Sequence, residues 1–219
     1  RRGLGELLGQ GVKRAAQALG RGSEEFALHV KGMELPMHDP RAFFAMAVNY
    51  ATGPRGPDHM RGYALAHETG LWASKAPASR FSDEGKGEGV KLTQDRSTML
   101  NCLILCVFCG QALGVDEIAE VLTWATGLPY SGDGVLRAGE RIINLQRAFN
   151  IRCGITGADD TLPSRLLRGT ENGSDRVPDL ARQLQDYYSA RGWTTDGIPT
   201  RGRLAELGLD TVARDLGLD

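Results

Sequence analysis

Apolar residues recur at helical spacing along most of this chain, and glycine or proline separates the segments that carry them. Over residues 4–19 the leucine, valine and alanine positions share one helical face, and Gly20 and Gly22 are expected to end that helix. The same period predicts helices over residues 41–51, for a short stretch from residue 59, and over residues 93–113, 116–126, 135–149 and 178–191. Asp116 is a suitable N-cap for the helix predicted over residues 116–126, and Gly192 is a suitable C-terminal stop for the one over residues 178–191.

The segments between these helices are rich in turn residues. Residues 52–58 are predicted to form a structured loop, residues 72–89 an irregular surface connection, and residues 169–176 a polar loop. Residues 26–30 allow either a short strand or the start of a loop, and strand alternation is absent elsewhere. The predicted fold class is therefore all-α.

Composition and charge narrow the classes of function. The 219 residues suit one large domain or one and a half, and the formal net charge of -1, with no dense basic stripe, argues against a nucleic-acid-binding protein. The longest uncharged apolar stretch, residues 99–114, is shorter than the ~20 residues that a membrane helix needs. Four cysteines, three of them close together, differ from a secreted disulfide framework and indicate a reducing cytoplasm. Because the chain begins at Arg1, we expect a processed product or a piece of a longer polypeptide.

Three cysteines lie within one apolar run. Cys102, Cys106 and Cys109 have the spacing C-x3-C-x2-C, which resembles the cluster motif of radical S-adenosylmethionine enzymes. That motif follows a strand at the start of an α/β barrel, and the strand–helix alternation of a barrel is absent here. At i, i+4 and i+7 the three thiols would share one helical face. The simplest alternative is that all three are small buried hydrophobic residues.

A longer succession of short motifs gives a more specific signal. In chain order these motifs are residues 30–41 (VKGMELPMHDPR), 47–52 (AVNYAT), 58–61 (DHMR), 80–86 (RFSDEGK), 139–145 (GERIINL), 147–150 (RAFN), 159–163 (DDTLP) and 187–193 (YYSARGW). Together with the cysteine run, they resemble the C-terminal portion of the aldehyde ferredoxin oxidoreductase family over residues 1–211. Each motif is weak alone, and their number and order make the resemblance specific.

The resemblance implies a domain organisation and an activity. Residues 1–32 would end a helical middle domain, and residues 33–219 would form the helical C-terminal domain of that fold. Family members hold tungsten, sometimes molybdenum, between two pterins beside a 4Fe-4S cluster, and Mg2+ bridging the pterin phosphates belongs to the expected cofactors. They oxidise an aldehyde with water to a carboxylate, and ferredoxin accepts the electrons.

The same resemblance implies that another polypeptide segment completes the site. In the family a longer N-terminal part cradles the pterins and supplies the first three cluster cysteines, so this part and ferredoxin are the expected partners. A homodimer is also compatible with the resemblance. By itself, the present chain is expected to be inactive and to hold neither tungsten nor a complete cluster.

Carried onto single positions, the resemblance assigns one ligand in the cysteine run. The family pattern D-x-x-G-L-C corresponds to residues 101–106, so Cys106 would be the fourth ligand of the cluster. Cys102 and Cys109 receive no role.

Neighbouring residues of this run would contact the pterin. Asn101 stands where an aspartate does so in the family, and its amide both donates and accepts hydrogen bonds. The backbone around Leu105 and Val107 is expected to touch the pterin as well. Ile104 replaces the usual glycine, which puts a close approach of that backbone in doubt.

A second group of site residues follows the Gly/Pro-rich loop. His59 matches a histidine beside the metal, where an imidazole near neutral pKa would handle a proton at the substrate oxygen. Arg55, Arg61 and Gly62 are expected to bind the pterin, because guanidinium groups suit phosphate oxygens and ring edges. The alternative for His59 is a loop-stabilising residue, and for the arginines simple surface charge.

Other polar residues are predicted to be structural. A buried or interdomain polar network is predicted for Glu140, Arg141 and Asn144. A turn rather than a catalytic carboxylate pair is predicted for Asp159 and Asp160. No chemistry is assigned to His29, His38, His67 and Cys153.

Three other functions stay open. A related enzyme that reduces aromatic acyl-CoA thioesters would share most of these motifs. A non-catalytic helical subunit or degenerate remnant is favoured by the departures at Asn101 and Ile104. A radical S-adenosylmethionine enzyme is the least favoured.

Overall fold

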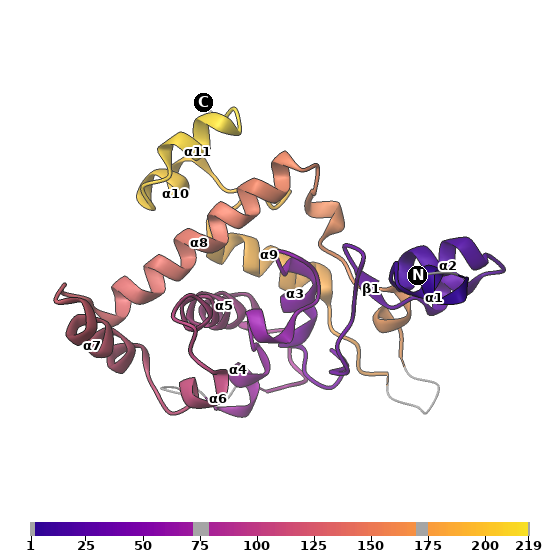
Figure 1. Ribbon diagram of the computed structural model, residues 1–219, viewed down its shortest axis with the longest axis horizontal. Coiled ribbons are helices and arrows are strands. Elements are labelled where there is room, and N and C mark those ends of the chain that lie inside the picture. The colour runs from indigo at the N-terminus through magenta and orange to yellow at the C-terminus, as the bar shows by residue number, and fades with distance from the viewer. Residues whose placement is uncertain (1–2, 72–78, 170–174, 219) are drawn as a thin grey trace.

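The computed structural model describes residues 3–71, 79–169 and 175–218 and is built mostly from helices (Figure 1). The first elements are α1 (Leu4–Leu8), α2 (Val12–Leu19), η1 (Ser23–Phe26), β1 (His29–Val30), β2 (Met33–Glu34), α3 (Ala45–Thr52), η2 (His59–Arg61) and α4 (Leu65–Thr69). The later elements are α5 (Lys86–Cys102), α6 (Val107–Gly110), α7 (Val115–Thr126), α8 (Gly132–Arg152), η3 (Gly157–Asp159), η4 (Ser164–Leu167), α9 (Leu180–Arg191), α10 (Arg201–Glu206) and α11 (Asp210–Asp215). The all-α class is confirmed, and β1 and β2 form only a two-residue antiparallel ladder.

Helix α5 lies at the centre of the molecule and packs against α3, α8 and α9 (Figure 1). All eight residues of α3 are buried, and they share a core with Ile143 of α8 and Tyr187 of α9. The C-terminal ends of α3 and α5 lead directly into the two segments with candidate chemistry. Packing of these two helices therefore sets the relative position of those segments.

The helical period located α7, α8 and α9, and Gly192 ends α9 in the left-handed conformation as predicted (φ 66°). The N-cap of α7 is Gly114 rather than Asp116. Residues 4–19 form two helices instead of one, because the chain turns at residues 9–11, where Gly11 has φ 89°. Helices α10 and α11 were not predicted.

Helix α5 begins seven residues before the predicted start at residue 93, inside the segment expected to be irregular. Its glycines allow close packing there: a Cβ on Gly87 would lie 2.4 Å from Tyr187 N, and one on Gly89 would lie 2.4 Å from the ring of His67. Residues 72–78 of that segment, like residues 170–174 of the predicted polar loop, lie outside the described residues. Within the described ranges, no helix combines the length and the apolar character needed to cross a membrane.

The helix predicted over residues 93–113 is correct only as far as Cys102, because α5 ends there in a Schellman motif. Leu105 N donates to Leu100 O at 2.9 Å, and Ile104 N donates to Asn101 O at 3.2 Å. This geometry requires a left-handed residue, and Ile104 has φ 57° with its side chain 92% exposed. The same 6→1 hydrogen bond closes α8, α9, α10 and α11, where the left-handed residues are Gly154, Gly192, Gly208 and Gly217. The end of α5 could not be predicted from the sequence because its left-handed residue is isoleucine rather than glycine.

Ile104→Gly should stabilise the folded chain by ~1 kcal/mol, because a β-branched residue is strained in the left-handed region while glycine is not. The matched reverse change is Gly154→Ile at the end of α8, where φ is 87° and an added Cβ meets nothing within 4 Å. The free energy of unfolding of that variant should fall by ~1–2 kcal/mol from backbone strain alone. Urea denaturation measures the free energy of unfolding of both variants. A loss of stability in Ile104→Gly would show that the backbone at Ile104 is not strained.

Candidate functional site

The loop between α3 and η2 is organised by one buried carboxylate. Asp58 Oδ1 accepts from Met60 N at 2.9 Å, and Oδ2 accepts from Arg55 Nε at 3.0 Å. Arg61 Nε lies 3.5 Å from the same Oδ2. Asp58 thus holds two guanidinium groups whose side chains stay 57% and 41% exposed. The result is a pre-ordered cationic surface suited to anionic oxygens. Sequence analysis did not single out Asp58, whose only signal is its position three residues from each arginine.

Asn49 of α3 supports this loop from inside the protein. Its Nδ2 donates to Asp58 O at 3.4 Å, and its Oδ1 accepts from Gln94 Nε2 of α5 at 3.2 Å. A Cβ on Gly62 would lie 1.7 Å from Asn49 Oδ1, so only glycine fits at this position. Gly62, predicted to bind the cofactor, therefore has a packing role that is independent of any ligand.

Gly62→Ala should lower the free energy of unfolding by ~1–3 kcal/mol, because the added methyl displaces a buried amide that is hydrogen-bonded on both sides. Gly202→Ala in α10 is the control, since a Cβ there meets nothing within 4 Å. The control should be neutral or gain up to ~1 kcal/mol from helix propensity. Chemical denaturation compares the two variants, and equal stabilities would exclude the tight contact at Gly62.

His59 opens η2 and lies partly buried against a second imidazole. The ring centroids of His38 and His59 are 4.7 Å apart, with an interplanar angle of 41°. Burial and the neighbouring His38 lower the pKa of His59, and Asp58 offsets only part of this shift. His59 is therefore neutral near pH 7 and able to accept a proton. His38, predicted to be structural, is exposed and belongs to the surroundings of the candidate site.

The cysteine run is a turn between two helices. Cys106 is the extended residue that precedes α6 (φ -61°, ψ 133°), while Cys102 ends α5 and Cys109 lies in α6. All three thiols are exposed, so neither a shared helical face nor burial as hydrophobic residues is correct. The backbone N–H groups of Phe108 and Cys109, which face the Cys106 sulfur, lower the pKa of this thiol. A thiolate is the form that binds a metal.

The two residues around Cys106 expected to touch a pterin are anchored in the protein. Val107 is 9% exposed, and Leu105 packs against the cluster formed by Met99, Leu100 and Ile118. With these side chains turned inward, a ligand at this turn would meet the backbone, as the resemblance implies.

Two side-chain hydrogen bonds join the cysteine turn to the histidine loop. Asn101 Nδ2 donates to Met60 O, in the middle of η2, at 3.4 Å. Gln111 Nε2, just after α6, donates to Tyr63 Oη at 3.1 Å. Segments some 40 residues apart in sequence therefore meet at one edge of α5. The structure brings the two groups of predicted site residues together.

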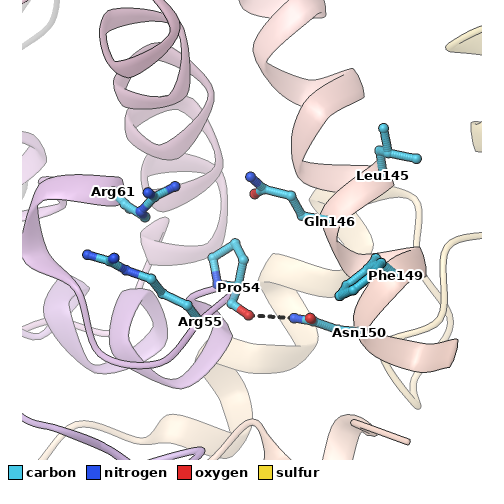
Figure 2. A pocket seen from close by; sticks show the side chains of 7 residues that line it. All are labelled: Pro54, Arg55, Arg61, Leu145, Gln146, Phe149 and Asn150. Carbon is cyan, nitrogen blue, oxygen red and sulfur yellow. Dashed lines mark hydrogen bonds between the residues drawn. The ribbon is translucent and has the colours of Figure 1, made fainter. Parts of the chain in front are cut away.

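A shallow cleft of about 390 Å³ lies beside the histidine loop. Figure 2 shows the guanidinium groups of Arg55 and Arg61 next to each other on one wall, and side chains of α8 on the opposite wall. The α8 wall consists of Leu145, Gln146, Phe149 and Asn150. Asn150 Nδ2 donates to the carbonyl of Pro54 at 2.5 Å and closes one end. The sequence did not indicate this wall, because α8 lies some 90 residues after the loop and their contact is not visible in the linear chain.

The donor set of the site fits one ligand position of an iron–sulfur cluster. Such a cluster takes four protein ligands. In the part of the chain that the structure describes, no three His, Cys, Asp or Glu side chains are gathered as a metal site. The three-cysteine chelate of a radical S-adenosylmethionine enzyme is thus not formed. Cys106 remains as an exposed thiol of lowered pKa, and any further ligands would come from another segment or polypeptide.

The carboxylates of Asp159 and Asp160, predicted to lie in a turn, both have structural partners. Asp159 forms a capping box with Thr156, which confirms the turn. Asp160 is instead a buried anchor: it pairs with Lys31 Nζ at 2.8 Å and accepts from Tyr188 Oη at 2.6 Å. Asp160 is therefore a buried carboxylate whose hydrogen-bonding capacity is used within the fold.

The polar network predicted on α8 is confirmed for two of its three members. Glu140 accepts from Lys91 Nζ at 2.9 Å, and Asn144 Oδ1 accepts from Trp193 Nε1 at 2.8 Å. Arg141 is exposed and donates to a main-chain carbonyl.

Comparison with known proteins gives a consistent set of relatives. The family model described as "Aldehyde ferredoxin oxidoreductase, domains 2 & 3" matches residues 1–209. The tungsten-containing aldehyde ferredoxin oxidoreductase of Thermococcus kodakarensis is 37% identical over 215 residues, which are 95% of this chain and 35% of that protein. The WOR-like subunit of an aliphatic sulfonate oxidoreductase from Pyrococcus furiosus is 26% identical over 98% of this chain and 34% of its own length. The chain thus spans about a third of the curated relatives that it matches.

A solved structure shares the fold at lower identity. The active site complex of benzoyl coenzyme A reductase with 1,5-dienoyl-CoA superposes with a TM-score of 0.69 at 21% identity, covering 97% of this chain and 37% of that chain. This likeness concerns the fold alone.

Proposed function

This chain belongs to the aldehyde ferredoxin oxidoreductase family, and we propose that it is the C-terminal part of a tungstopterin or molybdopterin iron–sulfur oxidoreductase. The proposed activity is oxidation of an aldehyde to a carboxylic acid with ferredoxin as electron acceptor. The proposal is supported by 37% identity to a tungsten-containing relative and by the fact that the chain corresponds to 35% of its length. An N-terminal part would supply the remaining cluster ligands and enclose the site.

One observation carries the proposal. The hydrogen bond from Asn101 to the carbonyl of Met60 holds the Cys106 turn against the His59 loop. The loop that carries His59, Arg55 and Arg61 thereby lies against the turn that carries Cys106, the proposed metal ligand. These are the groups that a pterin-bound metal beside a cluster would need from its protein.

When bound, the pterin-held metal and the cluster would supply the two-electron chemistry. Cys106 would bind cluster iron through its thiolate, and the amide of Asn101 would hydrogen-bond to a pterin ring. Arg55 and Arg61 would bind phosphate oxygens, since Asp58 already fixes both in place. His59 would accept a proton from the water or substrate oxygen at a ring nitrogen.

We also propose the domain boundary and the compartment that the sequence indicates. Residues 1–32 would close the preceding helical domain; α1 and α2 lie at one end of the molecule, apart from α5, α8 and α9 (Figure 1). Residues 33–219 would be the C-terminal domain. All four cysteines are free thiols, in keeping with a reducing cytoplasm.

Co-expression with a polypeptide that carries the N-terminal motif C-x2-C-x3-C tests the function. We expect a stable complex with about four irons and one tungsten or molybdenum per chain, which reduces ferredoxin or a viologen dye with an aldehyde as substrate. Turnover of an aromatic acyl-CoA thioester instead would assign the chain to the reductase branch. A complex without metal or turnover would identify a non-catalytic subunit or remnant.

The lowered pKa of His59 predicts the acidic limb of the pH profile. A base must be deprotonated, so aldehyde oxidation should fall as the pH drops through a pKa below the usual 6.5. His59→Gln should abolish this limb and lower kcat by ~10²-fold or more. Steady-state rates of both proteins across the acidic range provide the measurement. An unchanged limb in His59→Gln would assign it to another group.

A further inference from the structure

We propose that His38 is a second proton-handling residue, which passes protons between His59 and the solvent during aldehyde oxidation. This inference rests on the proposed function and extends it to a residue outside the motifs of the site. Its basis is geometric: a half-buried imidazole and an exposed imidazole lie 4.7 Å apart between ring centroids. Rings at this separation are close enough for one water molecule to bridge a nitrogen of each.

The loop that carries His38 is held in place on both sides. Before it, Leu35 N donates to Leu28 O at 3.1 Å, which continues the β1–β2 hairpin. After it, Arg41 Nε donates to Asp39 Oδ1 at 3.0 Å, and Arg41 Nη1 donates to Arg168 O at 3.1 Å. A fixed loop keeps the two rings at a constant distance and orientation, which proton transfer between them requires.

The balance of the proposed reaction explains why such a relay is useful. An aldehyde and water yield a carboxylate, three protons and two electrons. The electrons would leave through the metal centre and the cluster to ferredoxin or a dye. The protons need a separate route, and in this chain His59 is half-buried, whereas His38 is exposed. In each transfer a proton moves from a nitrogen of His59 to a nitrogen of His38 and then to water, and both rings return to the neutral state.

The charges around the two rings favour one proton on the pair at a time. Asp58, on the same loop as His59, attracts a proton to it, whereas burial and His38 oppose a second charge. Two imidazolium ions at this distance would repel each other.

The test uses the complex of this chain with its N-terminal part, as wild type, His38→Gln and Met37→Gln. Met37 is the matched control because it is the neighbouring residue on the same loop and is fully exposed (102%). In weak buffer, His38→Gln should lower kcat about 10-fold or more, and added imidazole should restore it, since a small base replaces the missing ring. Met37→Gln should match wild type at all buffer concentrations.

A second readout does not depend on turnover. Hydrogen–deuterium exchange at the imidazole C2 position, followed by mass spectrometry, gives the pKa of His59 in the complex. The pKa of His59 should rise in His38→Gln, because His38 no longer opposes protonation of His59, and stay unchanged in Met37→Gln.

Each outcome decides the proposal. Normal kcat in His38→Gln at low buffer, or a lower kcat that imidazole does not restore, overturns the relay and leaves aldehyde oxidation intact. An unchanged pKa of His59 shows that the rings are not coupled and also overturns it. If the wild-type complex oxidises no aldehyde, the proposed function fails first, and the relay fails with it.

Discussion

Replacement of Cys106 by serine is expected to abolish the cluster in the assembled enzyme. In the complex with the N-terminal part, Cys106→Ser should lose most of its iron and its aldehyde oxidation, because a hydroxyl is a far poorer ligand for iron than a thiolate. The tungsten or molybdenum content is expected to fall less, since the pterin has contacts of its own. Iron analysis and the cluster absorbance measure the loss.

Three other serine variants test whether the effect is specific. Cys153→Ser changes another exposed thiol, at the end of α8, and should keep full iron content. Cys102→Ser and Cys109→Ser should also retain the cluster, although Cys109 lies close enough to hydrogen-bond to Cys106. Loss of iron in Cys109→Ser with retention in Cys106→Ser would move the ligand by three positions. Retention in all four would remove the cluster from this chain.

Loss of the Asp95 carboxylate should have the largest effect on stability. Arg191 is fully buried and pairs through Nη1 with Asp95 Oδ1, while Lys91 Nζ lies 3.1 Å from Asp95 Oδ2. Burial opposes the charge of Arg191, but Asp95 and Tyr187 more than offset it and raise the pKa of the guanidinium. Asp95→Ala would leave a permanent buried cation without its counterion, which costs about 3–5 kcal/mol.

Chemical denaturation and thermal melting measure this effect, and the melting temperature should fall by on the order of 10 °C. Asp215→Ala is the control, because its partner Arg152 is 3.8 Å away and both side chains are more than 60% exposed. That change should stay within about 0.5 kcal/mol. If Asp95→Ala yields no folded protein, Asp95→Asn keeps the test open, since an amide preserves one acceptor and should lose less. Equal stability of Asp95→Ala and Asp215→Ala would show that the buried ion pair of Asp95 and Arg191 does not stabilise the fold.

Much of the candidate site could be proposed from the sequence because its parts are local in the chain. The Gly/Pro-rich loop, His59 and its flanking arginines follow one another within ten residues, and Cys106 stands in a short run. Asp58 and Asn49 were missed, because nothing in their spacing shows that one holds both guanidinium groups and the other fills the space left by Gly62. His38 was interpreted as structural for the same reason, since its neighbour in space is 21 positions away.

The end of α5 shows where a local rule itself failed. A Schellman motif normally announces its left-handed residue by glycine, and Ile104 hides it. The predicted helix therefore ran through Cys102 and Cys106 and placed three thiols on a common face that does not exist. Packing of Leu105 against the core cluster that contains Met99, Leu100 and Ile118 outweighs the backbone preference of one isoleucine.

The sequence alone determined the helical class, most helix positions and the family, because apolar periodicity and motif order are properties of the linear chain. The tertiary structure decided which of the candidate groups meet. The turn of Cys106 and the loop of His59 are joined because α5 packs against both α3 and η2, and Asn101 of α5 reaches Met60 of η2. Such proximity depends on how buried surfaces fit together, and residue spacing does not encode it.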